Sequence, residues 1–310
     1  MHQKQNLSAP LPGKLEYGQN GNVESKLVYL PAKTYKAISI EEAITNISEI
    51  RRGDGIEILP SKKLFITPEK IFNNGSSVKD TIFFELPGSY LGRSQIFTLD
   101  VIASSGASRP VYFTGKGHKG TLGLDQYLHP EGFAYRFIPS NNYEKDTMNQ
   151  KLNYDILMVR SQWSILEQKR VLVDDHIRKM IDIMHIRQNY SNLAISLSKS
   201  GHITSSFKVL NRLMKIAPID VVPYDQNCIQ IAHAYYLCGA FKNGDEIILG
   251  YAKQLIEEKY FFENLNPLVK GWVGTERSNN LYNFNKLVGI LKGHNRNEIF
   301  TKLETEYKLL

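Results

Sequence analysis

The sequence predicts a mixed α/β or α+β domain followed by an all-α domain of repeated helical hairpins. Between residues 26 and 139, short runs rich in β-branched and aromatic residues alternate with short segments of helical periodicity. After residue 170 every patterned segment is helical, and a five-residue pattern recurs 38 residues along the chain, as in stacked hairpins. The first copy is Leu193, Ala194, Leu197, Gly201 and Ile203, and the second is Ile231, Ala232, Tyr235, Gly239 and Phe241.

The N-terminal elements follow in order. Residues 1–25 are rich in Pro and Gly and poor in apolar residues, which favours a flexible segment. In the α/β domain, 26–139, strands are expected at 27–30, 55–59, 63–67, 81–86, 111–113 and 133–138, with helices at 40–50, 93–104 and 122–128. The polar stretch that starts at residue 140 opens a connector, 140–170, which holds one helix.

The C-terminal domain, 171–310, is predicted to contain helices at 174–200, 202–217, 224–239 and 244–260, which form two antiparallel hairpins. A degenerate third pair is expected at 281–291 and 298–309. Small residues at Ala194, Ser206, Ala232 and Gly244 would let paired helices approach closely. The pattern resembles the tetratricopeptide class, although that class has a period of about 34. A plain helical bundle is the alternative.

Composition and motifs indicate no particular chemistry. The net charge of +7 comes from scattered Lys and Arg, whereas a nucleic-acid groove needs them clustered on one face. Cys228 and Cys238 lie ten residues apart in one predicted helix, too far to bridge. No HExxH, CxxC or GxSxG motif is present, so we predict no metal, no cofactor and no catalytic residue. No apolar run of transmembrane length and no signal peptide is found, so the fragment is expected to be soluble.

Residues 115–120 spell GxGxxG after a predicted strand. The following helix is too short for a dinucleotide site, because Pro130 stops it. The next strand ends in Pro139 without the carboxylate that such a site needs at the strand tip, although Glu144 and Asp146 follow within the loop. A weaker hypothesis is that Arg109, Lys116, His118 and Lys119 hold a phosphate or carboxylate at this loop. A plain glycine-rich loop tip is the alternative.

Aromatic residues and arginine on a repeat surface are common anchors for protein partners. The candidate anchors are Arg187, Tyr190, Tyr224, Tyr235 and Tyr236. Burial in the core would explain most of them equally well. Arg109, Glu131 and Arg136 are expected to link strands.

An ordered set of segments carries a resemblance to a known family. It includes Arg-Pro-Val-Tyr-Phe at 109–113, Glu-Gly-Phe-Ala-Tyr-Arg-Phe-Ile-Pro at 131–139, Trp163, and Val-Pro-Tyr-Asp at 222–225. Over residues 85–240 the chain resembles the soluble C-terminal region of domain-of-unknown-function family 2723 (DUF2723), bacterial multi-pass membrane proteins related to protein O-mannosyltransferases.

The resemblance implies that catalysis and sugar-lipid binding belong to a membrane half that this chain does not include. The chain would then be a non-catalytic module on the periplasmic face of the inner membrane that binds acceptor protein or an assembly partner. Two alternatives stay open. The loop at 115–120 could bind an anionic or lipid-linked sugar phosphate, or the chain could be a free-standing repeat scaffold.

Overall fold

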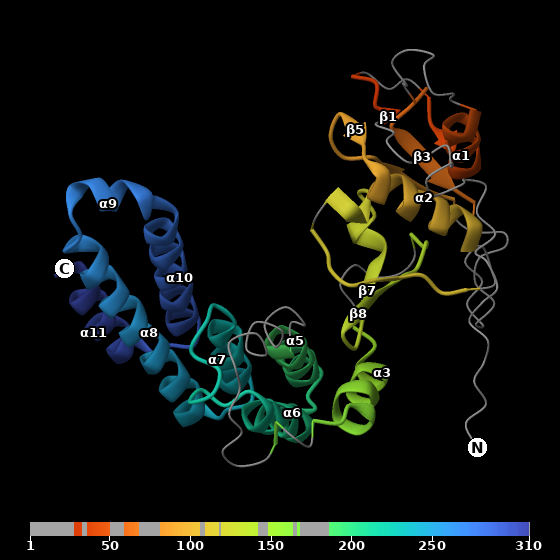
Figure 1. Cartoon of the computed structure of the whole chain (residues 1–310). Coiled ribbons are helices and arrows are strands. Elements are labelled where there is room, and N and C mark those ends of the chain that lie inside the picture. The colour runs from red at the N-terminus through yellow and green to blue at the C-terminus, as the bar shows by residue number, and fades with distance from the viewer. Residues whose placement is uncertain are drawn as a thin grey trace. The chain divides into compact units, whose positions relative to one another are not determined.

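The computed structural model describes residues 28–32, 36–49, 59–67, 81–105, 109–117, 119–141, 148–163, 166–167 and 186–309. The chain divides into two compact units, Met1–Met148 and Asn149–Leu310, coloured red to yellow-green and green to blue in Figure 1. The N-terminal segment 1–25, the strand expected at 55–59 apart from its last residue, and the start of the helix expected at 174–200 lie outside the described residues.

The described strands of the first unit form three small sheets. β1 (Val28–Tyr29) pairs with β5 (Tyr90–Leu91) in antiparallel fashion. The second sheet has the order β2 (Ile38–Ser39), β3 (Lys63–Ile66), β4 (Ile82–Glu85); β2 and β3 are parallel and β4 is antiparallel. The third has the antiparallel order β6 (Tyr112–Phe113), β8 (Ala134–Phe137), β7 (Leu128–Glu131).

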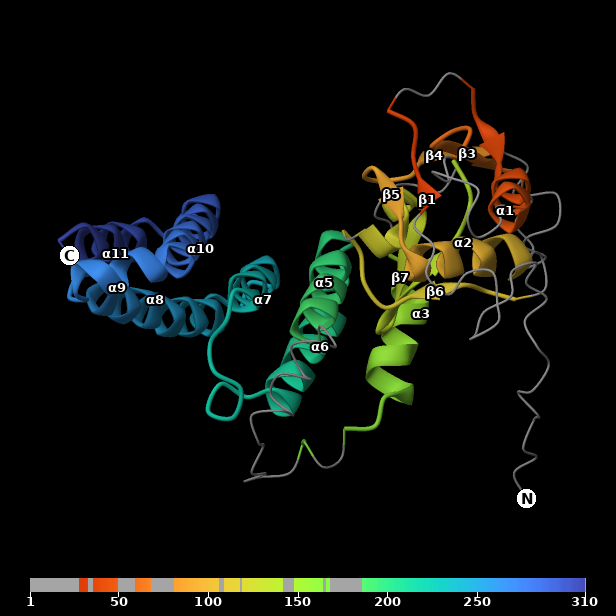
Figure 2. The same cartoon turned by 45° about the horizontal axis from the view of Figure 1, so that its top comes forward.

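The described α-helices of this unit, α1 (Ile40–Glu49) and α2 (Arg93–Ser105), lie beside the strands (Figure 2). In β4 the residues alternate between core and solvent, with Ile82 and Phe84 buried and Phe83 exposed. One core joins the apolar residues of α1, α2 and all three sheets. The mixed α/β prediction is confirmed here, and alternation in the strands and helical spacing in α2 are the patterns that predicted it.

The prediction of a helix at 122–128 is wrong. Two short 3-10 turns, η2 (Lys119–Thr121) and η3 (Asp125–Tyr127), lie in this region and lead directly into β7. The backbone between them is left-handed, with φ of +56° at Leu122 and +78° at Gly123, and this interrupts helical hydrogen bonding. A Cβ atom on Gly123 would lie 2.3 Å from the carbonyl oxygen of Glu85, so only glycine fits against β4.

All described elements of the second unit are helices, as predicted. The first is a single helix within the expected connector, made of α3 (Gln150–Tyr154) and the π-helical η4 (Asp155–Arg160). It is followed by α5 (Ile186–Lys199), α6 (Ile203–Ile216), α7 (Asn227–Leu237), α8 (Phe241–Glu263), α9 (Pro267–Trp272), α10 (Gly274–Gly293) and α11 (Asn297–Lys308). The sequence patterns did not predict α9, and α10 is longer than expected.

The same tight turn joins the helices of three pairs, α5–α6, α7–α8 and α10–α11. Gly201, Gly239 and Asn295 each have a positive φ, of +82°, +75° and +56°. At each turn the next residue donates its N–H to a carbonyl five residues earlier: His202 to Leu197 at 2.8 Å, Ala240 to Tyr235 at 2.9 Å, and Arg296 to Leu291 at 2.9 Å. This is the Schellman arrangement, which satisfies helix-terminal carbonyls and starts the next helix at once.

Small residues allow the paired helices to approach closely where the sequence predicted it. The Ser206 hydroxyl of α6 donates to the Ala194 carbonyl of α5 at 2.7 Å. A Cβ atom on Gly244 of α8 would lie 2.4 Å from the ring of Tyr236 in α7. These positions are also 38 residues apart, 206 against 244 and 194 against 232, as in the sequence pattern. Within the described residues, no helix is both long enough and apolar enough to cross a bilayer.

Candidate functional site

Arg187, a predicted partner anchor, lies in the core of the helical unit with 3% of its surface exposed. Its guanidinium donates to the carbonyl oxygens of Val222 and Pro223, the latter at 2.7 Å, and pairs with the Asp225 carboxylate at 3.1 Å. These acceptors belong to the connection between α6 and α7, which lacks helical partners for its carbonyls. Arg187 therefore holds that connection on α5, and its charge is compensated inside the fold.

Tyr190 is also fully buried. Its hydroxyl donates to the Leu157 carbonyl at 2.6 Å and accepts from the Trp163 indole at 3.1 Å, which fastens η4 and the following segment to α5. Burial raises its pKa above the usual tyrosine value. Tyr224 is half-buried and stacks on Tyr251, with ring centroids 6.4 Å apart. Its hydroxyl fills the space where a side chain at Gly250 would lie.

Tyr235 and Tyr236 of α7 are both buried, and they contact different helices. Tyr235 contacts Phe207 of α6 edge-to-face, and burial raises its pKa to about 12. Tyr236 donates to Asp245 of α8 at 2.9 Å, and Arg296 pairs with the same carboxylate. Side chains with almost no accessible surface cannot meet a partner. Arg187, Tyr190, Tyr235 and Tyr236 are thus core residues instead of the predicted surface anchors.

The glycine-rich loop at 115–120 is closed by a carboxylate from its own chain. Asp125 accepts the Gly117 N–H at 2.7 Å and the Thr121 hydroxyl at 2.9 Å. The Asp125 carboxylate occupies the Gly117 N–H donor and adds negative charge to the loop. Both effects disfavour the binding of an external phosphate. The sequence patterns missed Asp125, although an Asp that follows a Gly-rich turn is a common acceptor for its amides.

The basic residues proposed for this loop that the structure describes are Arg109, Lys116 and Lys119. The Lys116 ammonium lies 5.6 Å from the centroid of the Tyr135 ring. Arg109 and Lys119 are exposed, and His118 lies outside the described residues. The predicted link between Glu131 and Arg136 is present as an ion pair at 3.9 Å. Burial and a hydrogen bond to Glu131 raise the pKa of Tyr112 on the neighbouring strand.

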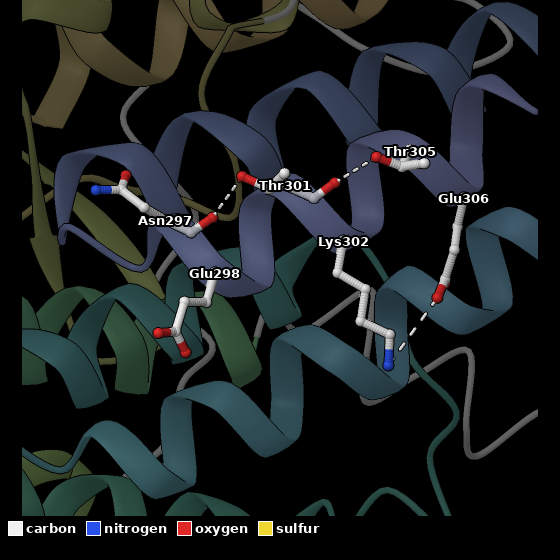
Figure 3. A pocket seen from close by; sticks show the side chains of 6 residues that line it. All are labelled: Asn297, Glu298, Thr301, Lys302, Thr305 and Glu306. Atoms are coloured by element: carbon white, nitrogen blue, oxygen red, sulfur yellow. Dashed lines mark hydrogen bonds and ion pairs between the residues drawn. The ribbon is translucent and has the colours of Figure 1, made fainter.

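A hollow of about 740 Å³ runs along α11 (Figure 3). Its six lining residues all come from this helix: Asn297, Glu298, Thr301, Lys302, Thr305 and Glu306. Thr301 and Thr305 donate to carbonyls one turn earlier, and Lys302 pairs with Glu306 at 4.0 Å. Four of the six side chains are engaged within the helix, and no other described element lines the hollow, so we assign no function to it.

A second hollow, of about 380 Å³, lies among α8, α10 and the end of α11. Glu263 accepts from Arg277 at 2.7 Å and from Lys270 at 3.5 Å, and these cations lower its pKa, chiefly through the Arg277 hydrogen bond. Deeper in, the Tyr307 hydroxyl donates to Asn280 at 2.8 Å, and Asn280 donates to the Leu255 carbonyl at 2.9 Å. These contacts hold α10 and α11 against α8.

The short helix α9 connects α8 to α10 (Figure 1). Large apolar side chains near this connection are exposed. We call this set the α9 surface. Its members are Tyr260, Phe261, Leu268, Trp272, Leu281 and Tyr282. None of the residues of α9 is buried. Leu268 and Trp272, four residues apart between Pro267 and Gly274, were the available sequence signal for this surface, and the sequence patterns missed it.

Among the described residues there is no group of three or more His, Cys, Asp or Glu side chains that could hold a metal ion. The family described as TMEM260-associated domain 2 matches residues 1–156, half of the chain. The chain belongs to this family. No curated protein and no solved structure matches the chain.

The TMEM260-associated domain 2 match covers the whole first unit and ends within η4. The glycine-rich loop, Asp125 and the Glu131–Arg136 ion pair therefore lie inside the matched region. The three hairpins and the α9 surface lie beyond it. The resemblance to DUF2723 names a different family and stays a prediction.

Proposed function

We propose that this chain is a non-catalytic module of a TMEM260-related protein glycosylation system, in which the helical unit binds an acceptor polypeptide or an assembly partner. The observation that carries the proposal is the recurrence of one Schellman turn in three successive helical hairpins. Arrays of such hairpins bury a continuous core between neighbours and leave helix faces for binding. The hairpins are accordingly proposed to be tetratricopeptide-like.

The contacts of the first two hairpins support this proposal. α5 packs on both α6 and α7, and α8 packs on α7 and α10, so each hairpin meets the next. Asn192 of α5 and Gln230 of α7 occupy equivalent positions, 38 residues apart, and both are half-buried. The Ser191 hydroxyl donates to Gln230 Oε1 at 3.5 Å. In the proposed peptide row, the remaining amide groups of the two side chains would donate to and accept from the backbone of an extended peptide.

The link to glycosylation is supported by two sequence relationships. The first unit belongs to the TMEM260-associated domain 2 family. The resemblance of residues 85–240 to membrane proteins related to protein O-mannosyltransferases points to the same kind of system. On this proposal the module lies at the periplasmic face of a bacterial inner membrane, and sugar transfer occurs on another part of the system.

The test is sugar transfer in cells that produce the protein in its native setting. Asn192→Arg combined with Gln230→Arg places two large cations on the proposed peptide row. Thr204→Arg, on the exposed side of α6, is the matched control. We expect the double variant to lower O-linked sugar on acceptor proteins while the control does not. Unchanged transfer with the double variant, at equal protein level, would refute acceptor binding through this row.

A further inference from the structure

A histidine pair lies between the second and the third hairpin. Nδ1 of His233, in α7, is 2.8 Å from Nε2 of His294, the residue that follows α10, and the two ring centroids are 5.0 Å apart. In this contact one ring donates its N–H and the other ring accepts it. A histidine with both nitrogens protonated can only donate, so the hydrogen bond needs at least one neutral ring. Both side chains are partly exposed, so protons from solvent can reach them.

The pair connects α7 with the tight turn between α10 and α11. His294 donates its own N–H to the Ile290 carbonyl at 3.1 Å and precedes Asn295, whose φ is positive. The ring of Tyr236 in α7 lies 4.9 Å from the His294 ring. An apolar core with members from α7, α8, α10 and α11 also holds the third hairpin in place. Separation of the two histidines would therefore move the turn without unfolding the hairpin.

The charged groups around the pair favour neutral rings. Described cations on the adjacent elements include Lys199 of α5, Lys292 of α10 and Arg296 at the start of α11. The carboxylates there are Asp245 of α8, which pairs with Arg296, and Glu298 of α11, which also acts on Arg296. Lys199 acts on the pair itself. A positive charge on either ring therefore meets a further cation.

The surroundings of the two rings disfavour their protonation. Burial lowers the pKa of both histidines, and for His233 the neighbouring imidazole and Lys199 lower the pKa further. Because the rings interact, the first proton on the pair opposes the second. The hydrogen bond between neutral rings is thus fully formed above about pH 6.5 and is lost as the pH falls through the lowered pKa values.

We propose that the His233–His294 pair is an acid-sensitive switch at the junction of α7 with the α10–α11 turn. Near neutral pH the shared proton holds the turn on α7. In acid both rings become charged, their repulsion separates the two nitrogens, and the turn moves away while the apolar core keeps the hairpins folded. His233 lies one helical turn from Gln230, so opening would change the end of the peptide row, and this consequence alone rests on the proposed function.

The experiment is NMR spectroscopy of the full chain with isotope-labelled histidine, titrated from about pH 7.5 to about pH 4.5. Nuclear Overhauser contacts between the rings of His233 and His294 report the closed junction. We expect these contacts at neutral pH and their loss once both rings are charged. Far-UV circular dichroism should stay constant over the same range, because the switch opens a junction and leaves the helices intact.

His294→Gln tests the coupling of the two rings. Glutamine keeps a hydrogen-bond partner for His233 but cannot become charged. We expect the pKa of His233 to rise in this variant, because the neighbouring imidazole is one cause of its lowered value. His202→Gln is the matched control, since His202 is exposed in the equivalent turn between α5 and α6, and it should leave the pKa of His233 unchanged. His233→Gln gives the reciprocal measurement on His294.

The proposal is overturned if the ring contacts persist when both histidines are charged, or if His294→Gln leaves the pKa of His233 unchanged. It is also overturned if circular dichroism shows that the helices unfold together with the loss of the contact, because the pair would then only report global unfolding. None of these measurements uses an acceptor, so the switch and acceptor binding through Asn192 and Gln230 can each fail alone.

Discussion

Arg187 offers the most decisive test of how the helical unit is held together. Truncation by Arg187→Ala would leave the carbonyls of Val222 and Pro223 and the carboxylate of Asp225 without their donor. Hydrogen bonds to a charged group contribute about 1.5–3 kcal/mol each. Removing one partner of a buried ion pair costs about 3–5 kcal/mol. Because Pro223 and Asp225 can reach water, we expect a loss of about 3–5 kcal/mol instead of the full sum.

The assay is urea denaturation followed by far-UV circular dichroism, which reports the free energy of unfolding. Arg160→Ala is the matched control, because Arg160 is 66% exposed and pairs with Asp155 at the surface. It should cost less than about 1 kcal/mol. Arg187→Lys should recover only part of the loss, because one ammonium cannot replace a forked guanidinium. If Arg187→Ala were no more destabilising than the control, the structural role assigned to Arg187 would be refuted.

Three further predictions concern single positions. Gly123→Ala should lower the free energy of unfolding of the first unit by more than about 2 kcal/mol, because a Cβ atom there meets the backbone of β4. Gly88→Ala, with a similar φ but open space around it, should cost less in the same urea-denaturation measurement. Asn295→Gly should raise stability by up to about 1 kcal/mol, because glycine adopts the left-handed turn conformation without strain; a loss would contradict the turn analysis. His233 and His294 lie 2.8 Å apart, and burial lowers the pKa of both, with the neighbouring imidazole as a second cause for His233. In the folded state the pKa of each histidine lies below the ordinary value of about 6.5. The contribution of the neutral pair to stability is therefore fully present above about pH 6.5 and is lost as the pH falls through the lowered pKa values. His294→Gln should therefore flatten the decline of the melting temperature in acid, and an unchanged pH profile would show that the pair does not contribute.

Several elements could be predicted because their residues carry the pattern locally. α1 and α2 repeat apolar residues at helical spacing, and β4 alternates strictly between core and solvent. Gly201 and Gly239 end their helices in the left-handed conformation, and both were predicted as helix ends. In these elements the neighbouring residues along the chain are enough to predict the local backbone conformation, and the tertiary contacts favour the same conformation.

The candidate sites could not be predicted in the same way. Arginine and tyrosine contact binding partners when they lie at a surface, and they stabilise the fold when they lie in a core. Residue type alone therefore does not distinguish a binding role from a structural one. Arg187 is internal because the α6–α7 connection supplies carbonyls 35 and 36 residues away, at Val222 and Pro223. The α9 surface depends on three helices meeting at one end of the unit, which no local pattern specifies.

The sequence by itself determined the division into a mixed α/β region and a helical region, the hairpin spacing, and the glycines at two of the turns. These follow from hydrophobic periodicity and from backbone conformations that only certain residues adopt. Tertiary structure alone decided which polar residues are buried and which apolar residues are exposed. Asp125 closes the glycine-rich loop, Arg187 and Tyr236 enter the core, and Trp272 stays in solvent. Burial depends on which distant segments cover a residue, and the pattern of neighbours along the chain does not contain that information.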